Sequence, residues 1–402
     1  MMTINKSIMR KQDQNPKPLG LYLHIPFCTE KCNYCDFLSF GGVGNDRQGQ
    51  YVNALVKEIE YYGKEYHNKY YVDTIFIGGG TPSILEVALI AELMAAVRAN
   101  FHVLPDAEIT MESNPKTLNR YKLNRYFDLG INRLSIGAQS LDNDLLAFLG
   151  RIHRAEDFLE SYQAAREAGF QNINTDLMFG IPGQNMECWL DTLKKVLKLM
   201  PEHISFYSLQ IEEGTPFFKM YREGRLEPID DDADRDMYHR AVELFYREGY
   251  HHYEISNCGR PGYECRHNLK YWSMDEYLGL GLGAHSYLEG ARFSNAERLS
   301  DYVEASRVSE NKSTSPFIVW YHKNSRQEDI SEYLFTGLRK REGIDLDDFE
   351  AQFQQPIEEI YADNWHRLKA FIESGYLVKT ENRLYFTKQG IDISNTILTE
   401  FV

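Results

Sequence analysis

The run Tyr22-Leu-His-Ile-Pro-Phe-Cys-Thr-Glu-Lys-Cys-Asn-Tyr-Cys-Asp-Phe37 decides how the rest of this sequence is interpreted. Its three cysteines, Cys28, Cys32 and Cys35, have the spacing C-x3-C-x2-C, and no fourth cysteine lies nearby. Cysteine thiolates hold iron–sulfur clusters, and a four-iron cluster normally takes four of them. Three close thiolates would bind three irons and leave the fourth iron open, as a metal site that does chemistry requires. The spacing therefore predicts a [4Fe-4S] cluster on this loop.

A zinc site is the alternative interpretation of the same loop. Zinc favours cysteine pairs of the C-x2-C type and a fourth cysteine or histidine ligand. His24 could be that ligand, but on an expected strand before Cys28 it is poorly placed to close the site. The other three cysteines, Cys188, Cys258 and Cys265, are too dispersed to hold a second cluster, so we expect ordinary thiols there.

Composition restricts the possible classes of function. A chain of 402 residues can form about two or three domains with a substantial core. The formal net charge of −15, without a visible basic patch, argues against a nucleic-acid partner. No apolar run is long enough for a transmembrane segment, and residues 1–19 are expected to be a disordered leader rather than a signal peptide. The crowding of three of the six cysteines in one loop favours the reducing cytoplasm.

Short apolar runs alternate with amphipathic stretches over residues 20–229. The expected strands are 20–27, 71–77, 107–111, 132–137, 172–179 and 203–211, and the expected helices are 50–65, 85–100, 117–129, 156–168 and 187–199. This alternation predicts an α/β fold with a parallel sheet and covering helices, in an open, partial (β/α)6 barrel. Functional residues should then cluster where strands end and loops begin.

Two further regions follow the predicted barrel. Residues 230–324 begin with an acidic helix that runs to about Arg247 and continue over 250–295 as strands and loops, a smaller mixed region. Residues 325–402 contain helices near 330–340 and 356–374, a hairpin within 375–386 and a final helix, a pattern typical of a winged-helix-like module. Acidic residues outnumber basic ones in this module, so we expect it to pack or to dock a partner rather than to bind DNA.

Glycines and polar residues recur at the ends of the expected strands. Gly78-Gly-Gly-Thr-Pro82 follows the second strand and precedes a helix, so its N–H groups are expected to face a negatively charged group. Glu112 ends the third strand, Gln139 ends the fourth, and Asp176 lies within the fifth. Several such residues around one barrel rim predict a polar pocket for a zwitterionic amino acid and a ribose diol. Arg151 could supply a positive charge for a carboxylate.

These motifs resemble the radical S-adenosylmethionine (SAM) proteins related to oxygen-independent coproporphyrinogen III oxidase. The resemblance rests on residues 22–37, 78–83, 112–115, 137–140 and 176–182, and it continues through 335–339 into the tail. It implies a [4Fe-4S] cluster on the three close cysteines, with SAM at the open iron. It also implies that the contacts of SAM are Tyr22, Tyr34, Gly79, Gly80, Thr81, Glu112, Gln139, Arg151 and Asp176.

Two branches of that family differ in their motifs. The oxidases resemble C-x3-C-x2-C-x-C and carry a long N-terminal extension, whereas this chain has Phe37 in place of the last cysteine and only 27 residues before Cys28. The chain also has His267-Asn-Leu-Lys-Tyr-Trp272, which matches the H-N-x-x-Y-W motif of the haem-chaperone branch. The match implies that His267 ligates haem iron while Tyr271 and Trp272 stack on the macrocycle.

The expected function is therefore that of a haem chaperone on a radical SAM scaffold, which would deliver haem to haem-accepting proteins such as those of the respiratory chain. Arg266 or Lys270 would pair with the haem propionates. A dimer is one option for its assembly. The alternative functions are an oxygen-independent coproporphyrinogen III oxidase and, less favoured by the acidic tail, a winged-helix regulator. For His267 the alternative is structural: it would cap a turn with Asn268, and Trp272 would fill the core between barrel and tail.

Overall fold

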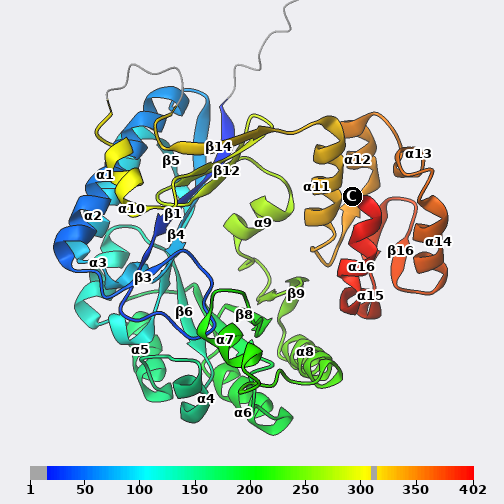
Figure 1. Cartoon of the computed structure of the whole chain (residues 1–402), viewed down its shortest axis with the longest axis horizontal. Helices are drawn as coiled ribbons and strands as arrows, with labels where there is room; N and C mark the ends of the chain where they lie inside the picture. The colour runs from blue at the N-terminus through cyan, green and yellow to red at the C-terminus, as the bar shows by residue number, and fades with distance from the viewer. Residues whose placement is uncertain (1–15, 309–314) are drawn as a thin grey trace, which may run out of the picture.

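A computed structural model describes residues 16–308 and 315–402. They form one large mixed sheet with its helices and a smaller module at the C-terminus (Figure 1). The centre of the sheet consists of parallel strands in chain order, namely β1 Lys17–Ile25, β4 Tyr70–Gly79, β5 His102–Ser113, β6 Arg133–Gln139, β7 Ile173–Phe179 and β8 His203–Ser208. The predicted barrel strands are thereby confirmed.

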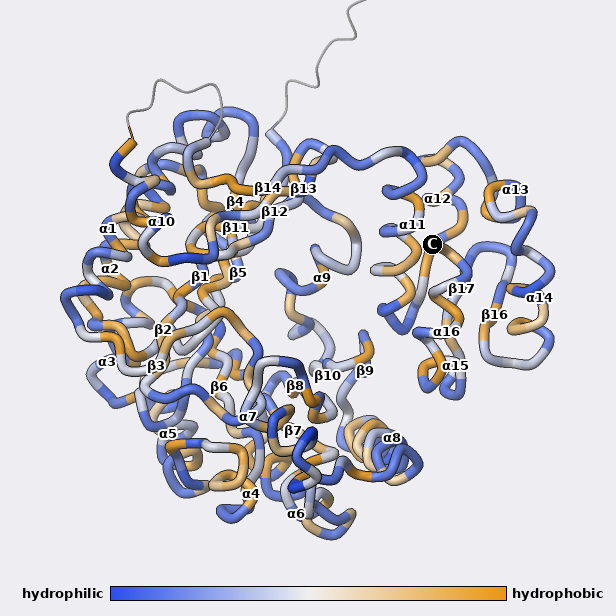
Figure 2. The backbone as a smooth tube through the Cα atoms, in the orientation of Figure 1, coloured by the Kyte–Doolittle hydropathy of each residue, from blue (hydrophilic) through white to orange (hydrophobic). Residues whose placement is uncertain are grey.

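Helices connect these strands because parallel neighbours require a crossover connection. They are α1 Asn45–Tyr66, α2 Val87–Asn100, α3 Arg120–Asp128, α4 Asn143–Phe148, α5 Ala155–Glu167 and α6 Met186–Leu197, with short 3-10 turns at Pro82–Ile84 and Pro115–Thr117. Hydrophobic residues recur along the central strands and the helices that cover them (Figure 2). Leu21, Leu23, Ile75 and Ile77 are completely buried there. This core leaves the opposite face of each strand to line the barrel interior.

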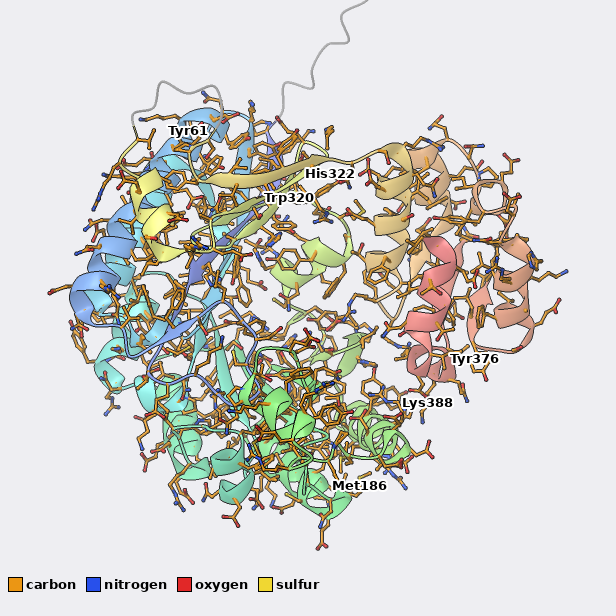
Figure 3. All side chains as sticks on the ribbon, viewed as in Figure 1. Tyr61, Met186, Trp320, His322, Tyr376 and Lys388 are labelled. Atoms are coloured by element: carbon orange, nitrogen blue, oxygen red, sulfur yellow. The ribbon has the colours of Figure 1, made fainter. Side chains whose placement is uncertain are left out.

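The mixed region extends both edges of the same sheet. On one side β11 Tyr277–Leu280 pairs in parallel with β1, and β12 His285–Leu288, β13 Ala291–Asn295 and β14 Ile318–Lys323 follow antiparallel. On the other side β10 Asn257–Gly259 pairs with β8, and β9 His251–Glu254 follows. Helix α7 Pro216–Arg222 precedes the mixed region, and helices α8 Asp231–Arg247 and α10 Leu299–Ala305 belong to it. Trp320 and His322 on the outer strand β14 stack with their ring centroids 6.1 Å apart (Figure 3).

The structure corrects the expectation of strands and loops over residues 250–295. A seven-residue helix, α9 Arg266–Trp272, lies within this range and contains the whole H-N-x-x-Y-W motif. It contacts β4 on one side and α11 on the other, between the barrel and the C-terminal module (Figure 1). A helix of two turns shows too little periodicity to be recognised from its sequence pattern.

The C-terminal module combines helices with a small antiparallel sheet, as expected for a winged-helix-like fold. Its helices are α11 Arg326–Gly337, α12 Leu346–Phe353, α13 Ile357–Ile360, α14 Trp365–Glu373, α15 Lys388–Asp392 and α16 Ser394–Leu398, followed by a 3-10 turn at Thr399–Phe401. Its sheet has the order β15 Ile344–Asp345, β17 Arg383–Phe386, β16 Leu377–Lys379. The single helix expected near 356–374 is interrupted between α13 and α14, where the Tyr361 hydroxyl donates to the carbonyl of Phe401 at 3.0 Å.

The boundary of the expected leader also changes. Residues 1–15 lie outside the described residues, but Lys17 already belongs to β1. The strand begins before residue 20 because Lys17–Leu19 pair with Tyr70–Val72 of β4. Among the described helices, none is long and apolar enough to cross a membrane.

Candidate cofactor site

A cavity of about 510 Å³ lies where the parallel strands of the barrel end. Of the residues expected to bind the cluster or SAM, it is lined by Cys28, Cys32, Tyr34, Cys35, Gly79, Gly80, Thr81, Glu112, Gln139, Arg151 and Asp176. Tyr22 does not line it. The Tyr22 ring lies behind Phe76, 6.3 Å between centroids, and the hydroxyl lies 2.9 Å from His24 Nδ1. The barrel topology thus brings together residues from four strands, from the segment after α4 and from the cysteine loop.

The cysteine loop is closed at its base by two short strands. Cys28 ends β2 Phe27–Cys28, which pairs in parallel with β3 Phe40–Gly41. Two side chains from outside the loop reach the sulfurs. Thr81 Oγ1 donates to Cys28 Sγ at 3.6 Å, and Arg151 Nη1 donates to Cys32 Sγ at 3.6 Å. Burial raises the pKa of the Cys35 thiol.

Three free thiols on one loop are a donor set that fits an iron–sulfur cluster. Among the described residues, no three His, Cys, Asp or Glu side chains converge closely enough for a single metal ion. The thiolates of a cluster bind different irons, so they do not need to converge on one point. His24 is also engaged, because Nε2 lies 2.9 Å from the Leu38 carbonyl and Nδ1 contacts Tyr22, which argues against it as a fourth zinc ligand.

The glycine-rich turn corrects one expectation. Its N–H groups were expected to face a negatively charged ligand, but each has a partner in the protein. Gly79 N donates to Glu112 Oε2 at 3.0 Å, Gly80 N to the Ile25 carbonyl at 2.9 Å and Thr81 N to the Phe27 carbonyl at 2.7 Å. Added Cβ atoms would lie 2.5 Å from the His24 ring at Gly79 and 2.6 Å from the Phe27 carbonyl oxygen at Gly80. The glycines therefore let β4 pack directly against the cysteine loop.

Two carboxyl groups, those of Glu112 and Asp176, face the same cavity. Burial, reinforced by the nearby charge of Asp176, raises the pKa of Glu112 to about 8. Asp176 accepts hydrogen bonds from Ser135 Oγ at 2.9 Å and from Asn174 Nδ2 at 2.6 Å. A ligand ammonium group beside Glu112 would favour its ionised form, so the pair can compensate a cationic ligand.

Gln139 and Arg151 are held at the end of β6. Gln139 has a φ of 63°, which is uncommon for a residue with a side chain and occurs often at functional sites. Its Oε1 accepts a hydrogen bond from the Tyr207 hydroxyl at 2.8 Å. Arg151 Nη2 donates to the Gly137 carbonyl at 2.9 Å, so this guanidinium links β6 to the cysteine loop.

Sequence reasoning missed a second ring of polar side chains deeper in the barrel. It consists of Arg133, Ser135, Asn174, Ser205 and Asn257, all of which line the cavity. Arg133 Nε and Asn257 Oδ1 are buried and have no hydrogen-bond partner among the described residues. The cavity therefore offers an unused donor and an unused acceptor, as expected for the site of a polar ligand such as SAM.

Of the residues expected to bind haem, His267 and Tyr271 contact each other, whereas Trp272 lies apart from them. His267 is completely buried, with Nδ1 2.9 Å from Thr74 Oγ1 and Nε2 2.9 Å from the Tyr271 hydroxyl. Burial, together with the charge of Lys270, lowers the pKa of His267 to about 3. Trp272 instead points toward the C-terminal module, where the Arg339 guanidinium lies 4.5 Å from its ring centroid. It lines a second cavity, of about 550 Å³, with Tyr333 and Gly337 of α11.

Two basic residues of α9, Lys270 and Arg266, were expected to pair with the haem propionates. Lys270 is buried and forms an ion pair with Asp73 at 2.9 Å, so the expectation that it pairs with a haem propionate is wrong for this conformation. Arg266 is exposed and donates to the Asp106 carbonyl at 3.0 Å. Asn268 lines the first cavity, the one that also contains the three cysteines. Helix α9 thus touches the candidate SAM site with one residue and the C-terminal module with another.

Comparison with known proteins agrees with this architecture. The Radical SAM superfamily model matches residues 22–196, and the HemN C-terminal domain model matches residues 324–393. Coproporphyrinogen III oxidase (HemN) from Escherichia coli, described as a radical SAM enzyme, shares the fold with a TM-score of 0.85 and 24% identity, over 97% of this chain and 91% of that chain. The chain therefore contains a radical SAM domain followed by a HemN-type C-terminal domain.

Curated relatives specify the family. Proteins named heme chaperone HemW are 33% identical in Lactococcus lactis, over 96% of this chain and 98% of the relative, and 35% identical in Bacillus subtilis, over 95% and 98%. The Escherichia coli HemW is 41% identical over 67% of this chain and 70% of its own length. This chain belongs to the HemW family of haem chaperones.

Proposed function

We propose that this protein binds haem and delivers it to haem-requiring proteins, and that it holds a [4Fe-4S] cluster and SAM in its barrel. One observation carries the proposal: a single chain joins the three-cysteine cavity to a helix with the H-N-x-x-Y-W motif. A cytoplasmic location is part of the proposal, and the six free cysteines support it because disulfides are rare in that compartment.

In this proposal Cys28, Cys32 and Cys35 are the protein ligands of the cluster. When bound, the cluster supplies an open iron for SAM and an electron source. The Thr81 hydroxyl and the Arg151 guanidinium donate to two of the sulfurs, which stabilises their negative charge and holds the loop in place. The glycine turn keeps the loop packed on β4.

The remaining polar groups of the cavity are proposed to orient SAM. Glu112 and Asp176 offer acceptors for its ammonium and hydroxyl groups, while Arg151 and Arg133 offer donors for its carboxylate. Buried side chains such as Arg133, Ser135 and Asn174 line the deeper part of the cavity, so a ligand group bound there would be shielded from water. The strained backbone of Gln139 directs its amide toward the same space.

An oxidase of the coproporphyrinogen type is the second candidate, favoured by the common fold with HemN. The identity of residue 37, a phenylalanine, argues against oxidase activity. It replaces the last cysteine of the oxidase-type motif, is 64% exposed and lies at the cavity rim. We therefore propose that the protein does not oxidise coproporphyrinogen III.

Anaerobic reconstitution of the full chain with iron and sulfide tests the proposal. Absorption spectra recorded with and without haem should show a cluster and a distinct Soret band, and mixing with an apo-haemoprotein should transfer the haem. Failure to bind haem after cluster assembly would contradict the chaperone function. Formation of protoporphyrinogen above the level of a cysteine-free variant would favour the oxidase.

A further inference from the structure

The guanidinium of Arg151 has each of its three nitrogens engaged by the protein. Nη1 donates to Cys32 Sγ at 3.6 Å, and Nη2 donates to the Gly137 carbonyl at 2.9 Å. Nε donates to Nδ1 of His153 at 3.4 Å. A guanidinium carries five N–H donors in a fixed plane, so these three contacts fix its orientation and leave two N–H groups for a ligand carboxylate. The direction of the Nη1–H group toward sulfur therefore depends on the other two contacts.

The two ring nitrogens of His153 have different roles. Nε2 lies 3.2 Å from the Ala138 carbonyl, and because a carbonyl oxygen only accepts, Nε2 carries the hydrogen. In a neutral imidazole the other nitrogen, Nδ1, then holds the lone pair and accepts from Arg151. Burial, together with the charge of Arg151, lowers the pKa of His153 to about 3, so the ring is neutral at neutral pH. His153 is thus a hydrogen-bond acceptor directed at the guanidinium.

The segment that leads from α4 to His153 is docked on the cysteine loop. Asn33 of the loop donates through its backbone N–H to the Leu149 carbonyl at 3.0 Å and through Nδ2 to the Phe148 carbonyl at 2.9 Å. On the other side, His153 is only 2% exposed, and its partner Ala138 on β6 is completely buried. The imidazole is therefore held in place between β6 and the guanidinium that it contacts.

A donor directed at a thiolate sulfur affects the reduction potential of the cluster that the sulfur holds. In a one-electron reduction the added negative charge lies on the irons and sulfurs, so an N–H group that donates to sulfur stabilises the reduced form more than the oxidised form. The contact between Arg151 and Cys32 therefore favours reduction. Any group that fixes the guanidinium also sets how well its hydrogen faces the sulfur.

We propose that His153 is a positioning residue for the cluster: the Nδ1 lone pair holds the Arg151 guanidinium so that Nη1–H donates to the Cys32 sulfur, which raises the reduction potential of a [4Fe-4S] cluster bound by this loop. This inference rests on the proposed function, with Cys32 as a ligand of the cluster. His153 itself does not line the cavity, so it acts through Arg151 and not by contact with a bound group.

Anaerobic titration of the reconstituted full chain with dithionite, followed by electron paramagnetic resonance of the reduced cluster, measures the midpoint potential. His153→Phe keeps an aromatic ring but lacks the acceptor, so the equilibrium constant for reduction should fall about tenfold, which is about 59 mV for one electron. His153→Asn places an amide oxygen near the position of Nδ1 and should restore the wild-type potential. His252→Phe is the matched control, because the His252 ring also contacts a carbonyl, that of Ile255 at 3.2 Å, and it should leave the potential unchanged.

A pair of substitutions tests whether His153 acts through Arg151. Arg151→Met removes the donor and should lower the potential at least as far as His153→Phe does. Adding His153→Phe to Arg151→Met should then cause no further shift. In the cluster-free chain, long-range proton–nitrogen correlation spectra should show the hydrogen on Nε2 of His153 and the lone pair on Nδ1, which is a readout that requires no cluster.

The outcomes separate this inference from the proposed function. If the wild type assembles no cluster, the proposed function fails and this inference fails with it. If the cluster assembles but His153→Phe leaves its potential unchanged, or if the spectra place the lone pair on Nε2, this inference alone is wrong. It is also wrong if His153→Phe shifts the potential equally in the Arg151→Met background. Iron content and thermal unfolding verify that each variant is folded, and His153→Leu, which also lacks the acceptor, replaces His153→Phe if that variant does not fold.

Discussion

The cysteine thiols of the loop are held by different neighbours although one motif supplies all three. Thr81 contacts Cys28 and Arg151 contacts Cys32, whereas for Cys35 burial raises the pKa of the thiol. Replacing all three cysteines by alanine should abolish the broad visible absorbance of the cluster and the bound iron and sulfide. Cys188→Ala is the control, because this thiol lies on α6, next to Asp142, and should leave cluster content unchanged. Iron and sulfide that survive the triple substitution would exclude these ligands.

The buried Glu112 carboxyl makes the stability of the ligand-free protein depend on pH. Its pKa is raised from 4.5 to about 8, so between these values the folded state holds a proton that the unfolded state has lost. The contribution of Glu112 to stability therefore falls as pH rises through this range, by at most about 1.4 kcal/mol per pH unit. Urea unfolding at pH 6 and pH 8 should show a smaller decrease for Glu112→Gln than for the wild type. Equal decreases would show that Glu112 is ionised throughout.

At the scale of residues, the sequence predicts those side chains that stand at strand ends. Glu112, Gln139 and Asp176 follow apolar runs, and parallel strands bring their ends to one rim. Arg133, Ser135 and Asn174 were missed because they lie within the strands rather than at their ends. Their alternation along β6 and β7, which Asp176 continues, is the signal of an inward-facing polar row that could have revealed them.

At the scale of elements, the strands and long helices of the barrel follow from local periodicity, whereas α9 does not. Its first turn is satisfied by Glu108 of β5, a residue far away in the sequence, so the helix depends on a tertiary contact. The continuation of the sheet was missed for the same reason. The pairing of β11 with β1 joins Tyr277–Leu280 to Gly20–Leu23. A local sequence pattern cannot indicate which distant strand a given strand will pair with.

Removing the Glu108 carboxylate should therefore destabilise α9 specifically. Glu108→Ala leaves two buried N–H groups without an acceptor and should cost about 1–3 kcal/mol of stability. Hydrogen exchange should become faster in Arg266–Trp272, and haem binding should weaken, while cluster content remains. Asp106→Asn, an exposed change on the same strand, is the control. Unchanged exchange in α9 would mean that the carboxylate does not hold this helix.

At the scale of the whole molecule, the C-terminal module is attached to the barrel along two lines of contact. Backbone hydrogen bonds join β9 and its following loop to residues 339–341, with Arg341 N donating to the Tyr253 carbonyl at 2.9 Å. Farther along, Asp392 of α15 lies 2.9 Å from His239 of α8. Trp272 lies between barrel and module with Arg339 over its ring. The position of the module is thus coupled to the helix that carries His267.

Substitution of Trp272 can distinguish a role in packing the C-terminal module from a role in stacking on haem. If it packs the module, Trp272→Ala should lower the stability of this contact by about 2 kcal/mol through lost apolar burial and the lost cation–π interaction. Amide exchange and protease cleavage should then increase in α11, near Arg326–Gly337, with or without haem. Trp320→Ala on the exposed edge strand β14 is the matched control and should change neither (Figure 3). If α11 stays equally protected while haem affinity falls, Trp272 contacts the macrocycle and does not hold the module, because a residue that only packs the interface cannot weaken haem binding without loosening α11.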